Sequence, residues 1–170
     1  MNVKTSLLKP YKTLGFSGIE MVEIVKNLNK LLANLIVHQM KLRNFHWNVM
    51  GNDFFELHEL FESYYRDIDS TIDKVGERVR IFGEFPVSTL QTSLNLSSIK
   101  EVDQNLTSIE MNRQLVGDYD IILSLLVDTL NSASDHGDAG TVHMVNELIL
   151  NLEKKHWMLN AWMRNETMKS

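Results

Sequence analysis

The sequence contains no cysteine and only two prolines, Pro10 and Pro86. The lack of cysteine excludes disulfide bonds and thiol catalysis. With two prolines and eight glycines among 170 residues, long stretches of the chain are free to be helical. No apolar run approaches the roughly 20 residues of a membrane-spanning helix, and residues 1–17 lack the apolar core of a secretory signal. We therefore expect a cytoplasmic protein with no membrane association.

The chain also lacks an excess of positive charge. The chain has 17 Lys and Arg residues and 22 Asp and Glu residues, which gives a formal net charge of −5. This balance argues against general affinity for nucleic acid, because the phosphate backbone attracts basic surfaces. A hydrophobic content of 44% is enough for one full core. We expect an N-terminal tail over residues 1–16 and a single domain over residues 17–170.

Four long helices are predicted from the periodicity of the apolar residues and from residues that begin or end helices. Two of them open with capping boxes, Ser17–Glu20 and Thr107–Glu110. The predicted long helices run from Ser17 to near Val49, from Asn52 or Asp53 to about Phe82, from Thr107 to about Gly137, and from Asp138 to about Arg164.

The long connection between the second and third of these helices carries its own signals. Val87–Leu96 is rich in Ser, Thr and Asn and is predicted to be irregular. Ser98–Glu101 is a further capping box, which predicts a short helix starting there. Short loops within each hairpin and a long central crossover are typical of one architecture. We predict an all-α fold, a ferritin-like four-helix bundle with a short extra helix in the central crossover.

Candidate metal ligands gather on the second predicted helix. His58 with Glu62, and Asp73 with Glu77, are each spaced i, i+4, so each pair shares a helix face. His46 precedes Gly51 and belongs to the first helix. A mixture of imidazole and carboxylate suits iron, zinc or manganese better than calcium or magnesium. The alternative is that these are solvated charges on helix faces.

The spacing between the two pairs constrains how they can share a metal. Glu62 and Asp73 are eleven residues apart, which is roughly 16 Å along a helix axis at about 1.5 Å per residue. No single metal reaches both. One centre built from both pairs needs two subunits, whose helices meet antiparallel across a two-fold axis and form two equivalent sites.

The residues around these ligands form a pattern that resembles the Dps family of small ferritin-like iron proteins, from about Ser17 to about Met163. The matching residues are His46-Trp47-Asn48, Gly51, Phe54, Leu57-His58, Phe61-Glu62, Asp73 and Glu77-Arg78. The resemblance implies a twelve-subunit cage that stores ferric mineral. It also implies a di-iron ferroxidase site between subunits, which oxidises Fe(II) with hydrogen peroxide or oxygen.

In that arrangement His46, His58 and Glu62 come from one subunit, and Asp73 and Glu77 come from its neighbour. Trp47 lies near the iron in the resembling family and can supply an electron. The alternative for Trp47 is that it serves only as a packing or interface residue.

A further alternative for the function of the protein is a shell that scavenges zinc or manganese.

DNA protection is the main alternative function, because DNA-binding members of the resembling family often use a tail that bears lysines. Here the tail has only Lys4, Lys9 and Lys12, with apolar residues such as Leu14 and Phe16 among or after them. We favour packing or disorder of this tail, and expect DNA binding to be weak or absent at neutral pH.

Several other residues have ordinary structural interpretations. Tyr64 and Tyr65 are predicted to pack, and Asp138 to cap a helix. Glu153–His156 is a Glu-x-x-His motif that we assign to the surface, since the second helix has no matching motif. His143 stands where many members of the resembling family carry Asp, which implies a less acidic pore for iron entry.

Overall fold

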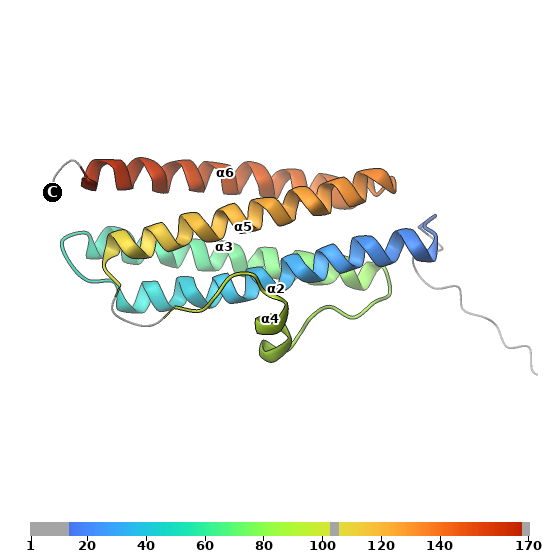
Figure 1. The fold of residues 1–170 in the computed structure, drawn as a ribbon, viewed down its shortest axis with the longest axis horizontal. Helices are drawn as coiled ribbons and strands as arrows, with labels where there is room; N and C mark the ends of the chain where they lie inside the picture. The colour runs from blue at the N-terminus through green and yellow to red at the C-terminus, as the bar shows by residue number, and fades with distance from the viewer. Residues whose placement is uncertain (1–13, 103–105, 168–170) are drawn as a thin grey trace, which may run out of the picture.

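Four long helices and one short helix make up the computed structural model, which describes residues 14–102 and 106–167 (Figure 1). These residues contain no β-strand. In chain order the helices are α2 (Gly18–Asn48), α3 (Phe54–Ile81), α4 (Leu90–Leu96), α5 (Ser108–Asp135) and α6 (Ala139–Thr167).

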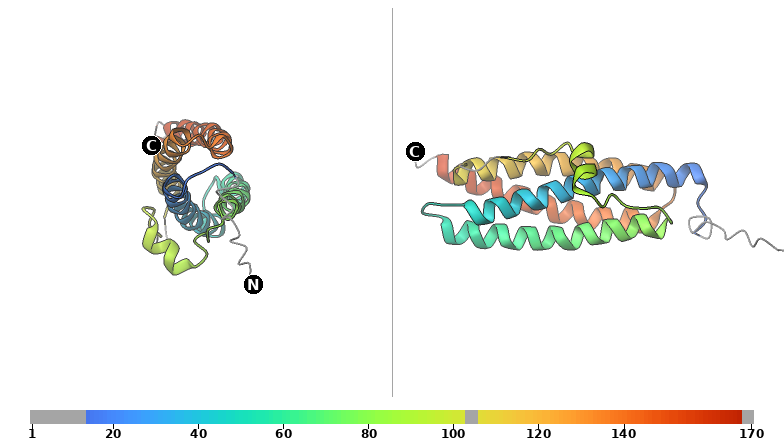
Figure 2. Two further views of the ribbon diagram at one scale, coloured as in Figure 1. Left: turned by 90° about the vertical axis from the view of Figure 1, so that its right-hand side faces the viewer. Right: turned by 90° about the horizontal axis from the view of Figure 1, so that it is seen from below.

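The long helices form two hairpins, α2–α3 and α5–α6, that lie side by side in one bundle (Figures 1 and 2). Helix α2 packs against α3, α5 and α4, whereas α6 packs mainly against α5. The short helix α4 lies outside the bundle, in the crossover that joins α3 to α5 (Figure 2). The predicted all-α fold with a long central crossover is confirmed.

The helix ends follow local chemistry. At the start of α5, the Thr107 N–H donates to Glu110 Oε2 at 2.8 Å, and Thr107 Oγ1 accepts the Glu110 N–H at 3.4 Å, which completes the predicted capping box. At the start of α6, Asp138 Oδ1 accepts the Thr141 N–H at 3.1 Å, as predicted for a capping residue. Gly137 has φ +70°, a conformation that suits glycine and ends the preceding helix.

The predicted position of the short helix is wrong. Helix α4 occupies Leu90–Leu96, within the segment predicted to be irregular, and Thr89 caps it by accepting the Thr92 N–H at 3.2 Å. The Ser98–Glu101 segment is not helical. There the buried Asn34 of α2 accepts the Ser98 and Ile99 N–H groups at 2.9 and 3.0 Å. Asn34 thus takes the Ser98 N–H, which the predicted capping box would have paired with Glu101.

A charged cluster lies in the bundle interior between α2 and α5. Lys41 Nζ lies 2.7 Å from Asp118 Oδ1, and His38 Nδ1 lies 2.9 Å from Asp118 Oδ2. All three side chains are buried. The negative carboxylate therefore holds two partners from successive turns of α2, and this pairing offsets part of the cost of burying charge.

The residues before α2 include part of the predicted tail. Phe16 packs edge-on against Phe82, with ring centroids 5.5 Å apart, whereas Leu14 is exposed. Lys4, Lys9 and Lys12 lie outside the described residues, so the predicted behaviour of the tail stays a prediction. Within residues 14–102 and 106–167, no helix is long and apolar enough to cross a membrane.

Candidate metal centre

Two histidines face each other where the α2–α3 hairpin closes. His46 lies in the last turn of α2 and His58 lies near the start of α3. Their rings are stacked, with centroids 3.8 Å apart and planes 25° apart. Each Nδ1 lies 2.8 Å from the backbone carbonyl oxygen of the other residue. The pair therefore ties the two helices together reciprocally.

These bonds determine which ring nitrogen is free to bind a metal. A carbonyl oxygen only accepts hydrogen bonds, so each Nδ1 carries the hydrogen and donates it. In the neutral ring the lone pair is then on Nε2. Backbone bonds of this kind orient imidazole ligands and set their tautomer in metal sites. Both histidines are therefore held ready as nitrogen donors.

Glu62 lies one turn beyond His58 and completes a group of three. One ligand atom from each of His46, His58 and Glu62 lies within 4.8 Å of the others. His46 is buried, and the other two are half-buried. In the part of the chain that the structure describes, this is the only such group of three or more His, Asp or Glu residues. Glu62 also forms an ion pair with Arg66, whose side chain is 71% exposed.

Asp73 and Glu77, the other two predicted ligands, do not join this group. Both are exposed on α3, where they line an open groove with Arg80 and Val87. A single chain thus brings together three of the five candidate ligands and presents the other two on its surface. Completion of the site by a second subunit stays a prediction.

Tyr65 and Phe54 contact the histidine pair within one chain, whereas the role of Trp47 stays a prediction. Trp47 is 62% exposed. Tyr65 instead sets its ring edge-on to His46, with centroids 5.4 Å apart. Arg43 of α2 places its guanidinium over the Tyr65 ring, 4.4 Å from the ring centroid. Tyr65 lies seven residues after His58, which is two helical turns along the same face. That spacing in the sequence could have identified Tyr65 as a neighbour of the histidine pair.

The remaining candidates take structural roles. Glu153 is exposed, and His156 pairs with Asp120 at 3.1 Å, which agrees with the predicted surface position of this motif. His143 is exposed and lies 3.6 Å from Glu147 on the next turn of α6.

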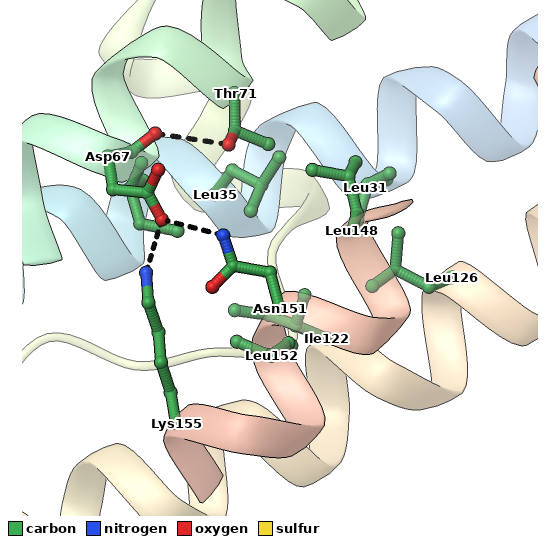
Figure 3. Close-up of a pocket in the computed structure, with 11 residues that line it drawn as sticks. Leu31, Leu35, Asp67, Thr71, Ile122, Leu126, Leu148, Asn151, Leu152 and Lys155 are labelled. Atoms are coloured by element: carbon green, nitrogen blue, oxygen red, sulfur yellow. Dashed lines mark hydrogen bonds and ion pairs between the residues drawn. The ribbon is translucent and has the colours of Figure 1, made fainter. Parts of the chain in front are cut away.

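A small cavity inside the bundle is separate from the metal centre. Its volume is about 20 Å³, and leucines and isoleucines form most of its wall. Asp67, Asn151 and Lys155 meet at one side, where both α6 side chains contact the Asp67 carboxylate (Figure 3). This space is enough for about one water molecule, and it contains no pair of metal-binding side chains.

Comparison with known proteins agrees with this fold. The model of the ferritin-like domain matches residues 25–168. The chain is 39% identical over 136 residues to the DNA protection during starvation protein (Dps) of Brevibacillus brevis, covering 80% of this chain and 91% of the relative. The chain belongs to the Dps family. The Dps resemblance noted in the sequence is confirmed.

Solved Dps structures share the whole bundle. The Dps protein of Vibrio cholerae O1 is 35% identical and superposes with a TM-score of 0.86, covering 88% of this chain and 94% of that chain. It is described as a member of a superfamily of ferritin-like diiron-carboxylate proteins. The Dps protein from Bacillus brevis is 36% identical with a TM-score of 0.84, covering 86% and 99%. The ferritin-like bundle is therefore confirmed, and a set of imidazole and carboxylate donors fits iron chemically.

Proposed function

We propose that this Dps-family protein is a ferroxidase that oxidises Fe(II) with hydrogen peroxide and stores the ferric product inside a hollow homo-oligomeric shell of twelve subunits. The observation that carries the proposal is the group formed by His46, His58 and Glu62. Its two imidazoles are already oriented by backbone bonds, and its carboxylate lies beside them.

The exposed position of Asp73 and Glu77 supports a site shared by two subunits. Both carboxylates lie on the same helix as Glu62, but too far along it to reach the same ion, at about 1.5 Å rise per residue. A second copy of α3, packed antiparallel, would bring its Asp73 and Glu77 to the histidine pair and create two equivalent sites. The site would then be incomplete in an isolated subunit.

Each residue has a defined task in this scheme. His46 and His58 offer neutral nitrogen donors, and Glu62 with the neighbouring subunit's Asp73 binds or bridges the iron substrate. Glu77 adds oxygen donors, which favour the ferric product as positive charge increases. Two Fe(II) ions together supply the two electrons that reduce hydrogen peroxide to water. Pairing them avoids the hydroxyl radical that a one-electron reduction releases.

The test is anaerobic loading with Fe(II), followed by hydrogen peroxide, while ferric absorbance and particle mass are recorded. We expect fast oxidation in a closed oligomer. His58→Ala combined with Asp73→Ala should nearly abolish it while the helical content is kept. His156→Ala is the matched control, because His156 is a surface histidine on α6 paired with Asp120. A double variant with the wild-type rate, or an active monomer, would contradict the proposal.

Co-assembly of the two single variants tests whether the site is shared. In a pair of one His58→Ala subunit and one Asp73→Ala subunit, one site carries both changes and the other carries neither. Mixed particles should therefore recover a fraction of the activity that each pure variant lacks. If the five ligands acted within single subunits, mixing would restore nothing.

DNA protection is the second candidate, and the names of relatives such as the Brevibacillus brevis protein favour it. A shell of twelve subunits would carry a formal charge of −60, from 12 × −5. This charge opposes contact with phosphate, although salt screens it over about 10 Å at 0.1 M. Three lysines per tail offer few opposing cations, so we place this function second.

A further inference from the structure

A groove between the central crossover and α5 shares no residue with the metal centre. Its volume is about 350 Å³, within the range of roughly 300–1,000 Å³ that is usual for small-molecule sites. Its wall contains Lys41, Lys100 and Arg113, and Asp118 is the only acidic residue among the described residues that line it. The wall therefore has a formal charge of +2, from three cations and one anion, although the whole chain has a net charge of −5.

Lys41 is the buried cation of this wall. Its side chain is only 2% exposed, and among the described residues its Nζ makes one hydrogen bond, of 2.7 Å to Asp118 Oδ1. An ammonium has three N–H donors, so two of them lack a partner there. A buried charge needs such bonds to offset the hydration that it has lost. Because Lys41 lines the groove, an anion bound there would supply the missing acceptors.

Asp118 does not cancel the positive charge of the groove. Its Oδ1 accepts from Lys41, and its Oδ2 accepts from His38 Nδ1 at 2.9 Å, so both carboxylate oxygens are already used. The negative charge of Asp118 is balanced by the ammonium that it holds. Lys100 and Arg113 remain as the excess positive charge of the wall.

Lys100 and Arg113 are both exposed and available to a ligand. Neither forms an ion pair within residues 14–102 and 106–167. Glu110 interacts electrostatically with Arg113. Its Oε2, however, already accepts the Thr107 N–H and hydroxyl at 2.8 and 2.7 Å, so Glu110 serves mainly as a capping residue.

Gly117 keeps the groove open on the side of α5. It lies inside that helix and lines the groove, although glycine in a helix interior is less stable than alanine. A Cβ at this position would meet no heavy atom within 4 Å, so tight packing does not account for the glycine. The missing side chain instead lets a ligand approach the α5 backbone closely.

We propose that this groove binds a free phosphate group, as inorganic phosphate or a small phosphate monoester, through Lys41, Lys100 and Arg113. The three cations come from α2, the crossover and α5, and a tetrahedral oxyanion presents oxygens in several directions at once. Arginine binds phosphate oxygens in pairs, and lysine binds them as a point charge. Ser98 and Gln114 add neutral polar groups to the wall.

A free phosphate fits this groove better than the phosphates of duplex DNA. Because Lys41 is buried at the groove wall, only a small anion can reach its ammonium, and a phosphodiester within a duplex cannot enter so far. Phosphate binding at this site also does not depend on iron oxidation, so it can be measured on iron-free protein.

The test is calorimetric titration of the iron-free, assembled protein with inorganic phosphate at pH 7 and constant ionic strength. We expect one phosphate per subunit. Lys100→Gln combined with Arg113→Gln should weaken binding by about tenfold or more, because two charged donors are lost. Lys26→Gln combined with Lys154→Gln is the matched control, which removes the same charge from exposed positions and should leave the affinity within about twofold. Equal losses in the two variants, or no binding by the wild type, would overturn the proposal.

A second variant tests the buried cation without changing the charge of the wall. Lys41→Met combined with Asp118→Leu removes one positive and one negative charge, so the wall stays at +2. Phosphate binding should again fall by about tenfold or more, while helical content and oligomeric state are kept. Unchanged affinity in a folded variant would overturn the proposal, because phosphate would then be held by exposed charges alone.

Two further measurements test the position of the ligand and its source. Gly117→Glu places a carboxylate in the groove and should abolish phosphate binding. Duplex DNA titrated under the same conditions should neither bind nor displace phosphate. Wild-type affinity in Gly117→Glu, or binding of duplex DNA that is lost in the variant without Lys100 and Arg113, would show that the groove is not a site for a small phosphate.

Discussion

Replacing Asp118 with alanine should be among the most damaging single changes in the bundle. Asp118 holds Lys41 at 2.7 Å and His38 at 2.9 Å, and the side chains of Lys41 and Asp118 are only 2% and 6% exposed. The variant leaves a buried ammonium without its counter-charge. Breaking a buried pair in this way costs about 3–5 kcal/mol, against a total stability of roughly 5–15 kcal/mol for a domain. For a chain of this length, that corresponds to a fall in melting temperature of about 6–20 °C.

The assay is thermal unfolding followed by circular dichroism at pH 7, on preparations matched for oligomeric state. Glu147→Ala is the control for an exposed pair, since His143 and Glu147 are 78% and 67% exposed, and it should cost less than about 1 kcal/mol. Lys41→Met combined with Asp118→Leu removes both charges and should recover most of the loss. If Asp118→Ala melts with the wild type, or if the double variant is as unstable as the single one, the reasoning about the uncompensated charge is refuted.

Three other results are expected. Because burial lowers the pKa of His38 from 6.5, the unfolded chain binds more protons than the folded chain at acidic pH. The free energy of unfolding should therefore fall as the pH drops below about 6.5. Denaturant unfolding at several pH values should show that this free energy depends less steeply on pH in His38→Gln. A Cβ at Gly140 would lie 2.9 Å from Arg78 Nη2, and the Arg78 guanidinium is held by the Asp138 and Thr141 side chains, so Gly140→Ala should cost about 1–3 kcal/mol. Gly117→Ala, where nothing lies within 4 Å, should be neutral or stabilising by up to about 1 kcal/mol in the same melts. Gel shifts should show little binding of duplex DNA at neutral pH and physiological salt, and tight binding that disappears on removal of residues 1–16 would show that the tail matters more than its three lysines indicate.

Local signals predicted the helices well, and long-range contacts account for the main error. The capping box at Thr107 forms because its donors and acceptors all lie within four residues. The similar signal at Ser98 fails because Asn34, 64 residues earlier, takes the Ser98 N–H that the capping box would have used. Nothing in the residues around Ser98 reveals that competitor, since it becomes a neighbour only after the bundle has folded.

In the metal centre too, local sequence signals predicted one part of the arrangement and long-range contacts determined the rest. Spacing along α3 placed His58 and Glu62 on one face, and the family pattern added His46 across the turn. The reciprocal bonds from each Nδ1 to the opposite carbonyl were beyond prediction, because they depend on how closely α2 and α3 approach. The buried pairing of Lys41 with Asp118 joins residues 77 positions apart, so no periodic pattern marks it.

The ion pair between Glu62 and Arg66 has a consequence for how tightly the proposed centre would hold iron. Glu62 already pairs with a tethered cation, and an arriving Fe(II) would compete with it for the carboxylate. Since the Arg66 side chain is 71% exposed, it can turn into solvent at small cost. When Fe(II), with charge +2, replaces the Arg66 guanidinium, with charge +1, the local charge rises by one unit and not by two. Affinity is moderated in the same step, because the guanidinium competes for the carboxylate throughout. Such a site is suited to passing ions onward into a mineral rather than retaining them.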